Sequence, residues 1–228
     1  MKIGIFFVYL YYSVKCIKMS SIILNKIQII PNASDVEEYD GQIDAVCKFC
    51  RGIEDGVFKA VCFSKIKPMP NIFKEESKEE DDWILSNWGA RSKALNCRWE
   101  DDDEIIFETI TYPAIPIFEI IAKKFPLIDF NFIFSNKDIG KTTVQISSKN
   151  GKISFFRKYK DFSKEAFGIT FHMNPETKNK FIFNPITNTY IRKNILQIKM
   201  AINNDGFFKD KDGTIMLKNY NNVDELPF

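Results

Sequence analysis

Short stretches of this chain alternate between apolar and polar residues, and a period of two indicates β-strands. In the stretch Leu127–Ser135, for example, Phe130, Phe132 and Phe134 fall on one face and Asn131 on the other. Strands are predicted in this way at residues 22–30, 94–100, 104–111, 127–135, 141–148 and 152–159. Asn150-Gly151, between the last two, is a strong signal for a type I′ hairpin turn.

Helical periodicity separates several of these strands and predicts helices at residues 35–51, 77–88 and 117–125. Ser34 or Asp35 is a suitable N-cap for the first helix, and Ser77 is one for the second. Gly89 follows the second helix as a C-terminal cap should. The segment from Phe58, which ends in the proline-rich FSKIKPMPNIF, is predicted to follow an extended path across a sheet. This order of elements predicts a small α+β sandwich.

The pattern loosens after Asp161, which suggests a division of the chain into parts. Residues 1–19 form an apolar N-terminal extension, residues 20–160 the main α+β domain, and residues 161–228 a smaller C-terminal α+β appendage with a mobile tail. Within the appendage, Ser163 can cap a short helix through Phe171. Strands are expected at Phe181–Phe183 and Tyr190–Met200, although the second of these also fits a helix.

The N-terminal extension contains an apolar run, Ile3–Val14, behind Lys2. This run is too short to span a bilayer as a helix, and no signal-peptide cleavage pattern follows it. Three interpretations stay open: translation that starts at Met19, a core or edge strand, and a membrane-targeting segment. A membrane association is the least favoured of them, and a cytoplasmic location is expected.

Charge is distributed unevenly along the chain. Residues 1–136 carry 16 Lys/Arg and 21 Asp/Glu, a net charge of −5, whereas residues 137–228 carry 16 and 9, a net of +7. A basic C-terminal part is typical of a protein that contacts an anionic partner. The alternative is a coding bias toward lysine, asparagine, isoleucine and phenylalanine.

The residues that carry catalytic chemistry do not form a recognisable set. Five cysteines are an odd number without disulfide-framework spacing, and Cys47-Lys48-Phe49-Cys50 lacks the second ligand pair that zinc requires. His172, the sole histidine, has no carboxylate beside it in the sequence. Consecutive acids at Asp101–Glu104 indicate a solvated turn. We therefore expect no catalytic residues, no metal and no small-molecule cofactor, and hence a non-enzymatic protein.

The order of several motifs carries a resemblance to a known family. A first strand contains Asn25, a phenylalanine-led I-P-M-P-type loop lies at Phe63–Pro70, and Asn87-Trp88-Gly89-Ala90-Arg91 stands where the family has N-W-G-T-K-W. Phe107-Glu108-Thr109 then precedes prolines and a helix. Over roughly residues 20–158 this order resembles the YubB-like ferredoxin-fold domain of plasmid, phage and integrative-element proteins.

This resemblance implies a ferredoxin-like antiparallel sheet with helices packed on one face, and an origin in a mobile element. The chain departs from the family where Ala90-Arg91-Ser92 replaces Thr-Lys-Trp, and where Tyr112 stands in place of a tryptophan. The family implies no catalytic residues.

Two groups of residues are candidates for binding. Asn87, Trp88 and Arg91 either form a ligand surface or pack and cap a helix end. In the strand KISFFRKYKDF, cations beside aromatics suit phosphate contact and base stacking. Its candidate residues are Lys152, Phe156, Arg157, Lys158, Tyr159 and Lys160.

Strict alternation would place Ile153 and Phe155 on one face of this strand and Phe156 and Lys158 on the other. An edge strand protected by lysines would have the same composition, so that interpretation stays open.

Two functions follow as hypotheses. The first is a non-enzymatic accessory protein of a phage or mobile element that binds a host or defence-system protein, for example as an anti-CRISPR does. The alternative is an RNA- or DNA-binding module that uses the basic aromatic strand at residues 152–162.

Overall fold

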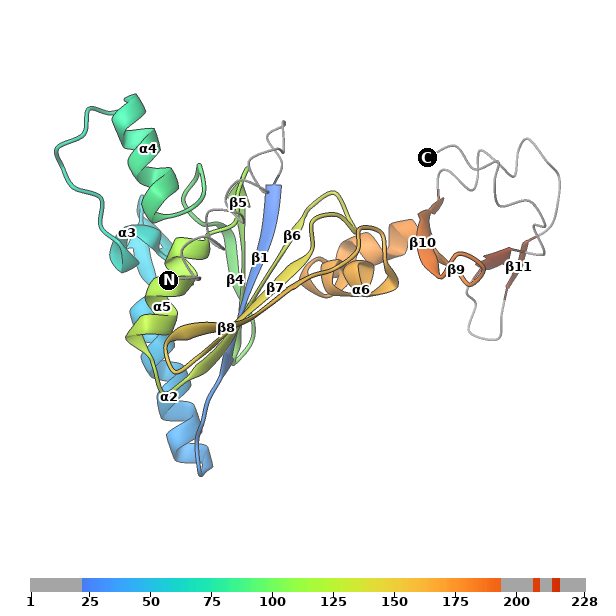
Figure 1. The fold of residues 1–228 in the computed structure, drawn as a ribbon, viewed down its shortest axis with the longest axis horizontal. Helices are drawn as coiled ribbons and strands as arrows, with labels where there is room; N and C mark the ends of the chain where they lie inside the picture. The colour runs from blue at the N-terminus through green and yellow to red at the C-terminus, as the bar shows by residue number, and fades with distance from the viewer. Residues whose placement is uncertain (1–21, 194–206, 210–214, 218–228) are drawn as a thin grey trace.

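The computed structural model describes residues 22–193, 207–209 and 215–217. The N-terminal extension, most of the strand expected at Tyr190–Met200 and the tail at Asn219–Phe228 lie outside the described residues. The described part is an α+β structure built on a six-stranded antiparallel sheet (Figure 1). Its strand order is β4-β5-β1-β6-β7-β8. The α+β class predicted from the sequence is therefore confirmed.

The strands of this sheet agree with the predicted ones to within a few residues. They are β1 (Ile22–Ile30), β4 (Leu95–Asp101), β5 (Glu104–Ile110), β6 (Asp129–Asn136), β7 (Val144–Lys149) and β8 (Lys152–Lys158). The turn between β7 and β8 has φ of +52° at Asn150 and +69° at Gly151, which confirms the predicted type I′ geometry. Both edge strands, β4 and β8, carry irregularities in their pairing.

One face of the sheet carries most of the hydrophobic core. The helices on this face are α2 (Val36–Cys50), α3 (Phe63–Ile66) and α5 (Ile115–Lys124), and α4 (Lys78–Asn87) adjoins them. Phe118 of α5 stacks on Phe132 of β6 with ring centroids 5.0 Å apart, and both side chains are fully buried. Burying one such side chain stabilises the fold by about 1.5–3 kcal/mol relative to leaving it exposed.

Local sequence signals fix where these helices begin. The side chain of Asp35 accepts a hydrogen bond from the backbone N–H of Glu38, and that of Ser77 accepts one from Glu80. Each cap satisfies an amide that has no partner inside the helix. Pro116 lies in the first turn of α5, where its missing N–H costs nothing.

The segment after Cys50 differs from the prediction. Residues 52–57, for which no element was predicted, form most of a hairpin of β2 (Gly52–Glu54) with β3 (Val57–Lys59). In the segment from Phe58, which was predicted to run extended, Phe63–Ile66 form the short helix α3. Asp55 and Gly56 both have positive φ in the hairpin turn. Asp-Gly is a strong signal for such a turn, so the hairpin was predictable from this dipeptide.

The opposite face of the sheet carries a helix as well. Helix α6 (Lys164–Met173) begins at its predicted cap Ser163, and its Met173 packs against Leu24, Ile106 and Ile133 on that face. Figure 1 shows α6 on the side of the sheet away from α2 and α5. The expectation of helices on one face concerned residues 20–160, whereas α6 belongs to the predicted C-terminal appendage. This helix covers apolar side chains on alternate positions of β1, β5 and β6 on the second face.

Beyond α6 the chain forms small elements. They are the 3₁₀ helix η1 (Pro175–Lys180), β9 (Phe181–Asn184), β10 (Thr189–Arg192), β11 (Phe207–Lys209) and β12 (Ile215–Leu217). Phe167 and Phe171 of α6 pack with Phe181 and Tyr190 from this region in a separate aromatic cluster. Among the described residues, no helix combines the length and apolar character needed to cross a membrane.

Candidate nucleic-acid interface

The second face of the sheet is only partly covered by α6. Strand register places Gln28, Asn131, Ser147 and Phe155 in one row across β1, β6, β7 and β8. Directly paired residues project to the same face of an antiparallel sheet, so these four side chains share a surface. None of them is buried, and Phe155 is 48% exposed.

Neighbouring positions of β7 and β8 extend this row. We call the whole surface the open sheet face and define it by Gln28, Asn131, Gln145, Ser147, Phe155, Arg157 and Tyr159. Gln145 pairs with Arg157 in the register, and Tyr159 follows Arg157 by two positions. The open sheet face therefore combines amides, hydroxyls, a cation and aromatic rings on four adjacent strands.

Hydrogen bonds between side chains hold these polar groups in place. Ser147 Oγ donates to Asn131 Oδ1 at 2.6 Å, and Asn131 Nδ2 donates to Gln28 Oε1 at 3.2 Å. The Tyr159 hydroxyl donates to Gln145 Oε1 at 2.9 Å. Because each side chain has a fixed partner, a ligand would meet oriented donors and acceptors rather than freely rotating ones.

Arg157 and Tyr159 form a second fixed unit. The guanidinium carbon of Arg157 lies 4.6 Å from the centroid of the Tyr159 ring. A cation–π contact of this kind is worth about 0.5–1 kcal/mol at an exposed site. The contact holds the guanidinium close to the sheet, where its planar fork can meet a phosphate or a base.

A β-bulge changes which side chains of β8 reach this face. Ser147 pairs with Phe155 but Ser148 pairs with Ile153, so Ser154 is an extra residue in β8. As a result Ile153 and Phe156 both pack against the core of the helix-covered face. The strict alternation predicted for this strand is wrong at Ile153, which lies opposite to Phe155.

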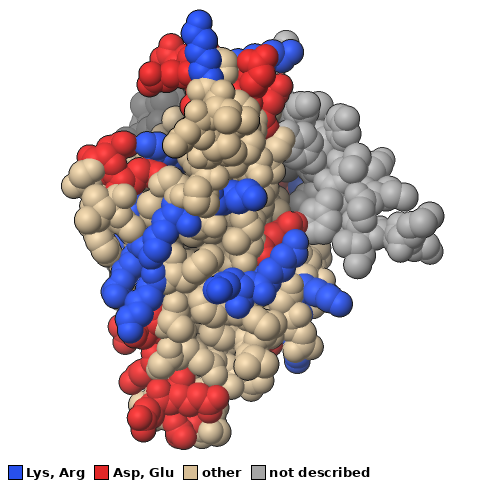
Figure 2. Space-filling view, turned by 90° about the vertical axis from the view of Figure 1, so that its left-hand side faces the viewer, with Lys and Arg blue, Asp and Glu red and all other residues tan. Residues whose placement is uncertain are grey.

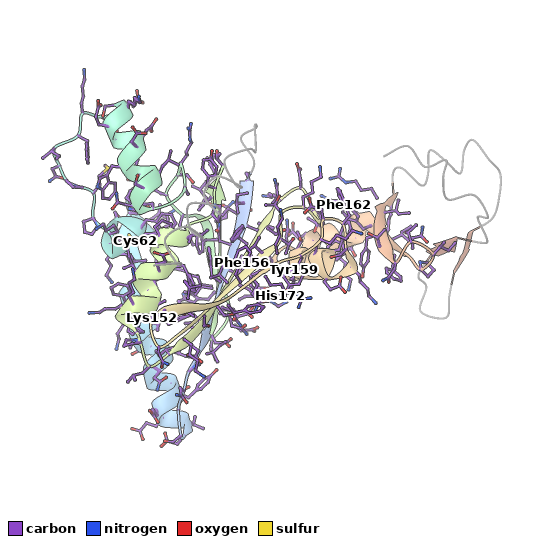
Figure 3. The ribbon with its side chains drawn as sticks, viewed as in Figure 1. Cys62, Lys152, Phe156, Tyr159, Phe162 and His172 are labelled. Atoms are coloured by element: carbon purple, nitrogen blue, oxygen red, sulfur yellow. The ribbon has the colours of Figure 1, made fainter. Side chains whose placement is uncertain are left out.

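The hairpin of β7 and β8, with the residues that flank it, carries charge of one sign. Between Asp138 and Asp161 there are six basic residues and no acidic one. All six side chains are exposed: Lys141, Lys149, Lys152, Arg157, Lys158 and Lys160. Figure 3 shows Lys152 and Phe162 toward opposite ends of β8.

Acidic side chains gather elsewhere. Figure 2 shows the helix-covered side of the molecule, with acidic groups at its bottom, groups of both signs at its top and several basic groups in the middle. The first turns of α4 and of α2 carry acidic side chains, and Asp102 and Asp103 lie near Tyr39 of α2.

The predicted site residues fall into two separate places. Lys152, Arg157, Lys158 and Lys160 are exposed on the β7–β8 hairpin, as expected of a binding strand. Tyr159 is half-buried on the open sheet face, held by its hydrogen bond. Phe156 is half-buried on the other face, where it packs against the core, so it does not join the aromatic residues of the open sheet face.

Asn87, Trp88 and Arg91 lie on the helix-covered side. Trp88 is 3% exposed and its Nε1 donates to the carbonyl oxygen of Lys67 at 2.9 Å. Asn87 Nδ2 donates to the carbonyl oxygen of Trp83, one turn earlier in α4. Arg91 is exposed. The burial of Trp88 favours the packing and capping alternative over a ligand surface at this helix end.

One polar cluster was missed by sequence reasoning. Lys26 Nζ lies 2.7 Å from Glu104 Oε1, and His172 Nε2 lies 2.9 Å from Glu104 Oε2. Lys26 and Glu104 are buried between the sheet and α6. Alternation in β1 places Lys26 on this face, but only the pairing of β1 with β5 and the docking of α6 bring the three residues together.

The carboxyl group of Glu104 is shifted by opposing influences. Burial raises its pKa, but hydrogen bonds from Lys26 and His172 outweigh the burial and hold the pKa below the usual 4.5. Glu104 is therefore ionised at neutral pH and balances the charge of Lys26. This arrangement is an internal ion pair rather than a reactive group, since Lys26 and Glu104 are both enclosed.

The cysteines do not form a reactive or metal-binding centre in the described part of the chain. Cys47, Cys50, Cys62 and Cys97 are free thiols, and no group of three metal-ligating side chains occurs among the described residues. Burial raises the pKa of Cys47 to about 11 and also raises that of Cys50. Such thiols are protonated at neutral pH and are weak nucleophiles.

No family model, no curated protein and no solved structure matches this chain. The resemblance to the YubB-like domain therefore rests on its motifs alone and stays a prediction.

Proposed function

We propose that the protein is a non-enzymatic nucleic-acid-binding protein that contacts phosphates through the β7–β8 hairpin. The observation that carries this proposal is the run of six exposed basic side chains without a carboxylate between Asp138 and Asp161. Electrostatic contact with phosphates supplies most of the affinity of non-specific nucleic-acid binding. Aromatic residues beside the cations suit RNA or DNA better than they suit a small anion.

We also propose that β4, β5, β1 and β6 form a ferredoxin-like core to which the β7–β8 hairpin is added. The chain order β1, α2, β4, β5, α5, β6 supports this proposal, because it follows the β-α-β-β-α-β sequence of that fold. The small elements between α2 and β4 are then insertions. In this arrangement β7 and β8 widen the sheet and place the basic residues at its outer edge.

Fluorescence anisotropy of a labelled single-stranded oligonucleotide, titrated at several salt concentrations, tests the phosphate contacts. Replacing both Lys158 and Lys160 with glutamine should weaken binding and reduce the slope of log K against log salt by about 1.4, which is 0.7 for each lost contact. The matched control replaces Lys74 and Lys78, two exposed lysines near the start of α4. Equal losses in both variants, or no binding at low salt, would contradict the proposal.

A second candidate function is supported by a different surface. The β2–β3 hairpin exposes three large apolar side chains, Ile53, Val57 and Phe58, at 75%, 55% and 62%. Isolated exposed apolar residues are ordinary, but three on one small hairpin suit a protein contact. We propose as the alternative that an accessory protein of a phage or mobile element would use this hairpin to bind a host or defence-system protein.

Affinity purification from a bacterial host, followed by mass spectrometry, tests this alternative. One partner protein should co-purify with the natural chain and be lost when Ile53 and Phe58 are both replaced by serine. That partner should still co-purify with the Lys158→Gln/Lys160→Gln variant. A partner retained by the serine variant would exclude the β2–β3 hairpin as its binding site.

A further inference from the structure

We propose that the ligand is a single strand whose bases lie on the open sheet face, so that the protein binds unpaired bases as well as phosphates. This inference rests on the proposed nucleic-acid-binding function and specifies its substrate class. It is carried by the row Gln28, Asn131, Ser147 and Phe155 together with the Arg157–Tyr159 pair.

The row of Gln28, Asn131, Ser147 and Phe155 is long enough to accommodate a short run of bases. Its four residues lie on adjacent strands, which are spaced about 4.8 Å apart, so the row covers roughly 14 Å. Sheet surfaces of other folds stack two or three bases over an area of this kind. The row begins at Phe155 on the basic edge strand β8 and leads inward to β1. A strand held by its phosphates at β8 could therefore lay its bases along the row.

Phe155 is the main stacking candidate. It is 48% exposed on the edge strand β8, and the bulge at Ser154 leaves it outward while Ile153 and Phe156 turn inward. A large aromatic ring on a solvent-facing sheet surface gains little for folding. Stacking of a base on such a ring has an energetic benefit that does not depend on base identity.

The amides of the row supply the hydrogen bonds that base edges need. Asn131 Oδ1 already accepts from Ser147, and Asn131 Nδ2 already donates to Gln28 Oε1. Within the described residues, Gln28 Nε2 donates no hydrogen bond. The donors of Gln28 are thus held in a fixed direction by Asn131 and remain available for an acceptor on a base.

The charges that face this surface are compatible with an anionic strand. Glu104 projects to the same face beside Gln28, but its charge is met by Lys26, and its second carboxylate oxygen lies 2.9 Å from His172 Nε2. Asp129 lies two positions before Asn131 at the beginning of β6, and the exposed Lys149 and Lys152 lie at the same end of the sheet. The net charge around the row is therefore positive near β8.

A duplex fits this surface less well than a single strand. The base edges of a duplex are reached only through its grooves, which admit a helix or a two-stranded ribbon. A broad six-stranded sheet would touch the outer phosphates of a duplex and leave the row without a ligand. Unpaired bases, in contrast, can turn toward the sheet.

Two labelled probes with equal phosphate numbers separate base binding from phosphate binding. One is a twelve-residue oligothymidylate, run alongside its oligouridylate equivalent, and the other is an abasic strand of the same length. The full chain should bind a base-containing probe at least about ten-fold more tightly than the abasic one, as expected when one or more bases stack. A matched duplex should bind no more tightly than the abasic strand.

Substitutions then locate the bases. Phe155→Ala should weaken binding of the base-containing probes by about 5- to 100-fold and leave the abasic strand unaffected. Phe58→Ala is the matched control, because Phe58 is also exposed, at 62%, but lies on the β2–β3 hairpin and outside the strand at residues 152–162. Gln28→Leu provides a second variant that removes a donor of the row.

The possible results distinguish base binding on the open sheet face from phosphate binding by the β7–β8 hairpin. Equal affinity for base-containing and abasic probes would overturn base binding while leaving the phosphate contacts of the proposed function in place. No binding of any probe would overturn both. Equal losses from Phe155→Ala and Phe58→Ala would overturn the assignment of the bases to the open sheet face.

Discussion

The buried ion pair of Lys26 and Glu104 stabilises the sheet face on which the candidate site lies. Both groups are taken out of water beneath α6, where an unpaired charge is far more costly than a paired one. Their contact links β1 to β5, and His172 extends it to α6. The cluster thus ties the helix that bounds the open sheet face to two central strands.

Replacement of Glu104 by glutamine should destabilise the protein strongly. The variant would leave the ammonium group of Lys26 buried without a negative partner, and losses of about 3–5 kcal/mol are typical of such a change. Chemical denaturation with urea measures the free energy of unfolding. The double variant Lys26→Met/Glu104→Leu should recover most of the loss. A single variant within about 0.5 kcal/mol of the natural protein would contradict this account of the ion pair.

The lowered pKa of Glu104 also predicts how stability depends on pH. A carboxyl group whose pKa is lower in the folded state stabilises the fold fully above its unfolded value, near 4.5. That contribution is lost as the pH falls from there through the folded pKa. Unfolding free energies measured between pH 6 and pH 3 should therefore fall less steeply for Glu104→Gln than for the natural protein. A profile for Glu104→Gln that runs parallel to that of the natural protein would argue against the prediction.

At the scale of the elements, two glycines with different surroundings should respond in opposite ways to alanine. Gly89 after α4 has φ of +83°, and an added Cβ would lie 2.5 Å from Pro116 Cδ and 2.8 Å from the carbonyl oxygen of Pro113. Gly89→Ala should therefore cost more than about 2 kcal/mol. Gly41 lies inside α2 with nothing within 4 Å, so Gly41→Ala should stabilise by about 0.5–1 kcal/mol. Thermal unfolding of both variants tests this contrast, which similar shifts would refute.

Individual strands also show which features could be predicted from the sequence and which could not. Strands such as β6 were predictable because Phe130, Phe132 and Phe134 mark one face without interruption. The sheet face to which Ile153 projects was not predictable, because the bulge at Ser154 depends on how β8 pairs with β7 and not on β8 alone. The β2–β3 hairpin was overlooked although Asp55-Gly56 signalled it, since three-residue strands show too little alternation to be recognised.

For the whole molecule, the candidate site depends on contacts between distant segments. The sequence predicted the basic strand β8, and the lysines there are exposed as expected. It did not predict the row that joins Gln28 to Phe155, because that row exists only through the register of four strands. Nor did it predict that α6 would cover one part of this face and leave the other part open.

The distribution of charge over the molecule gives a final prediction about where a bound strand lies. Lysine acetylation with a small reagent, read by mass spectrometry, reports the accessibility of each amine. Saturation with a single-stranded oligonucleotide should lower the reactivity of Lys149, Lys152, Lys158 and Lys160 by at least about two-fold, because phosphates would pair with these amines. Lys48, which pairs with Asp44 near the end of α2, and Lys74 before α4 lie outside the β7–β8 hairpin and should react as before. Protection of Lys48 and Lys74 to the same degree would show that the strand is not confined to the basic hairpin.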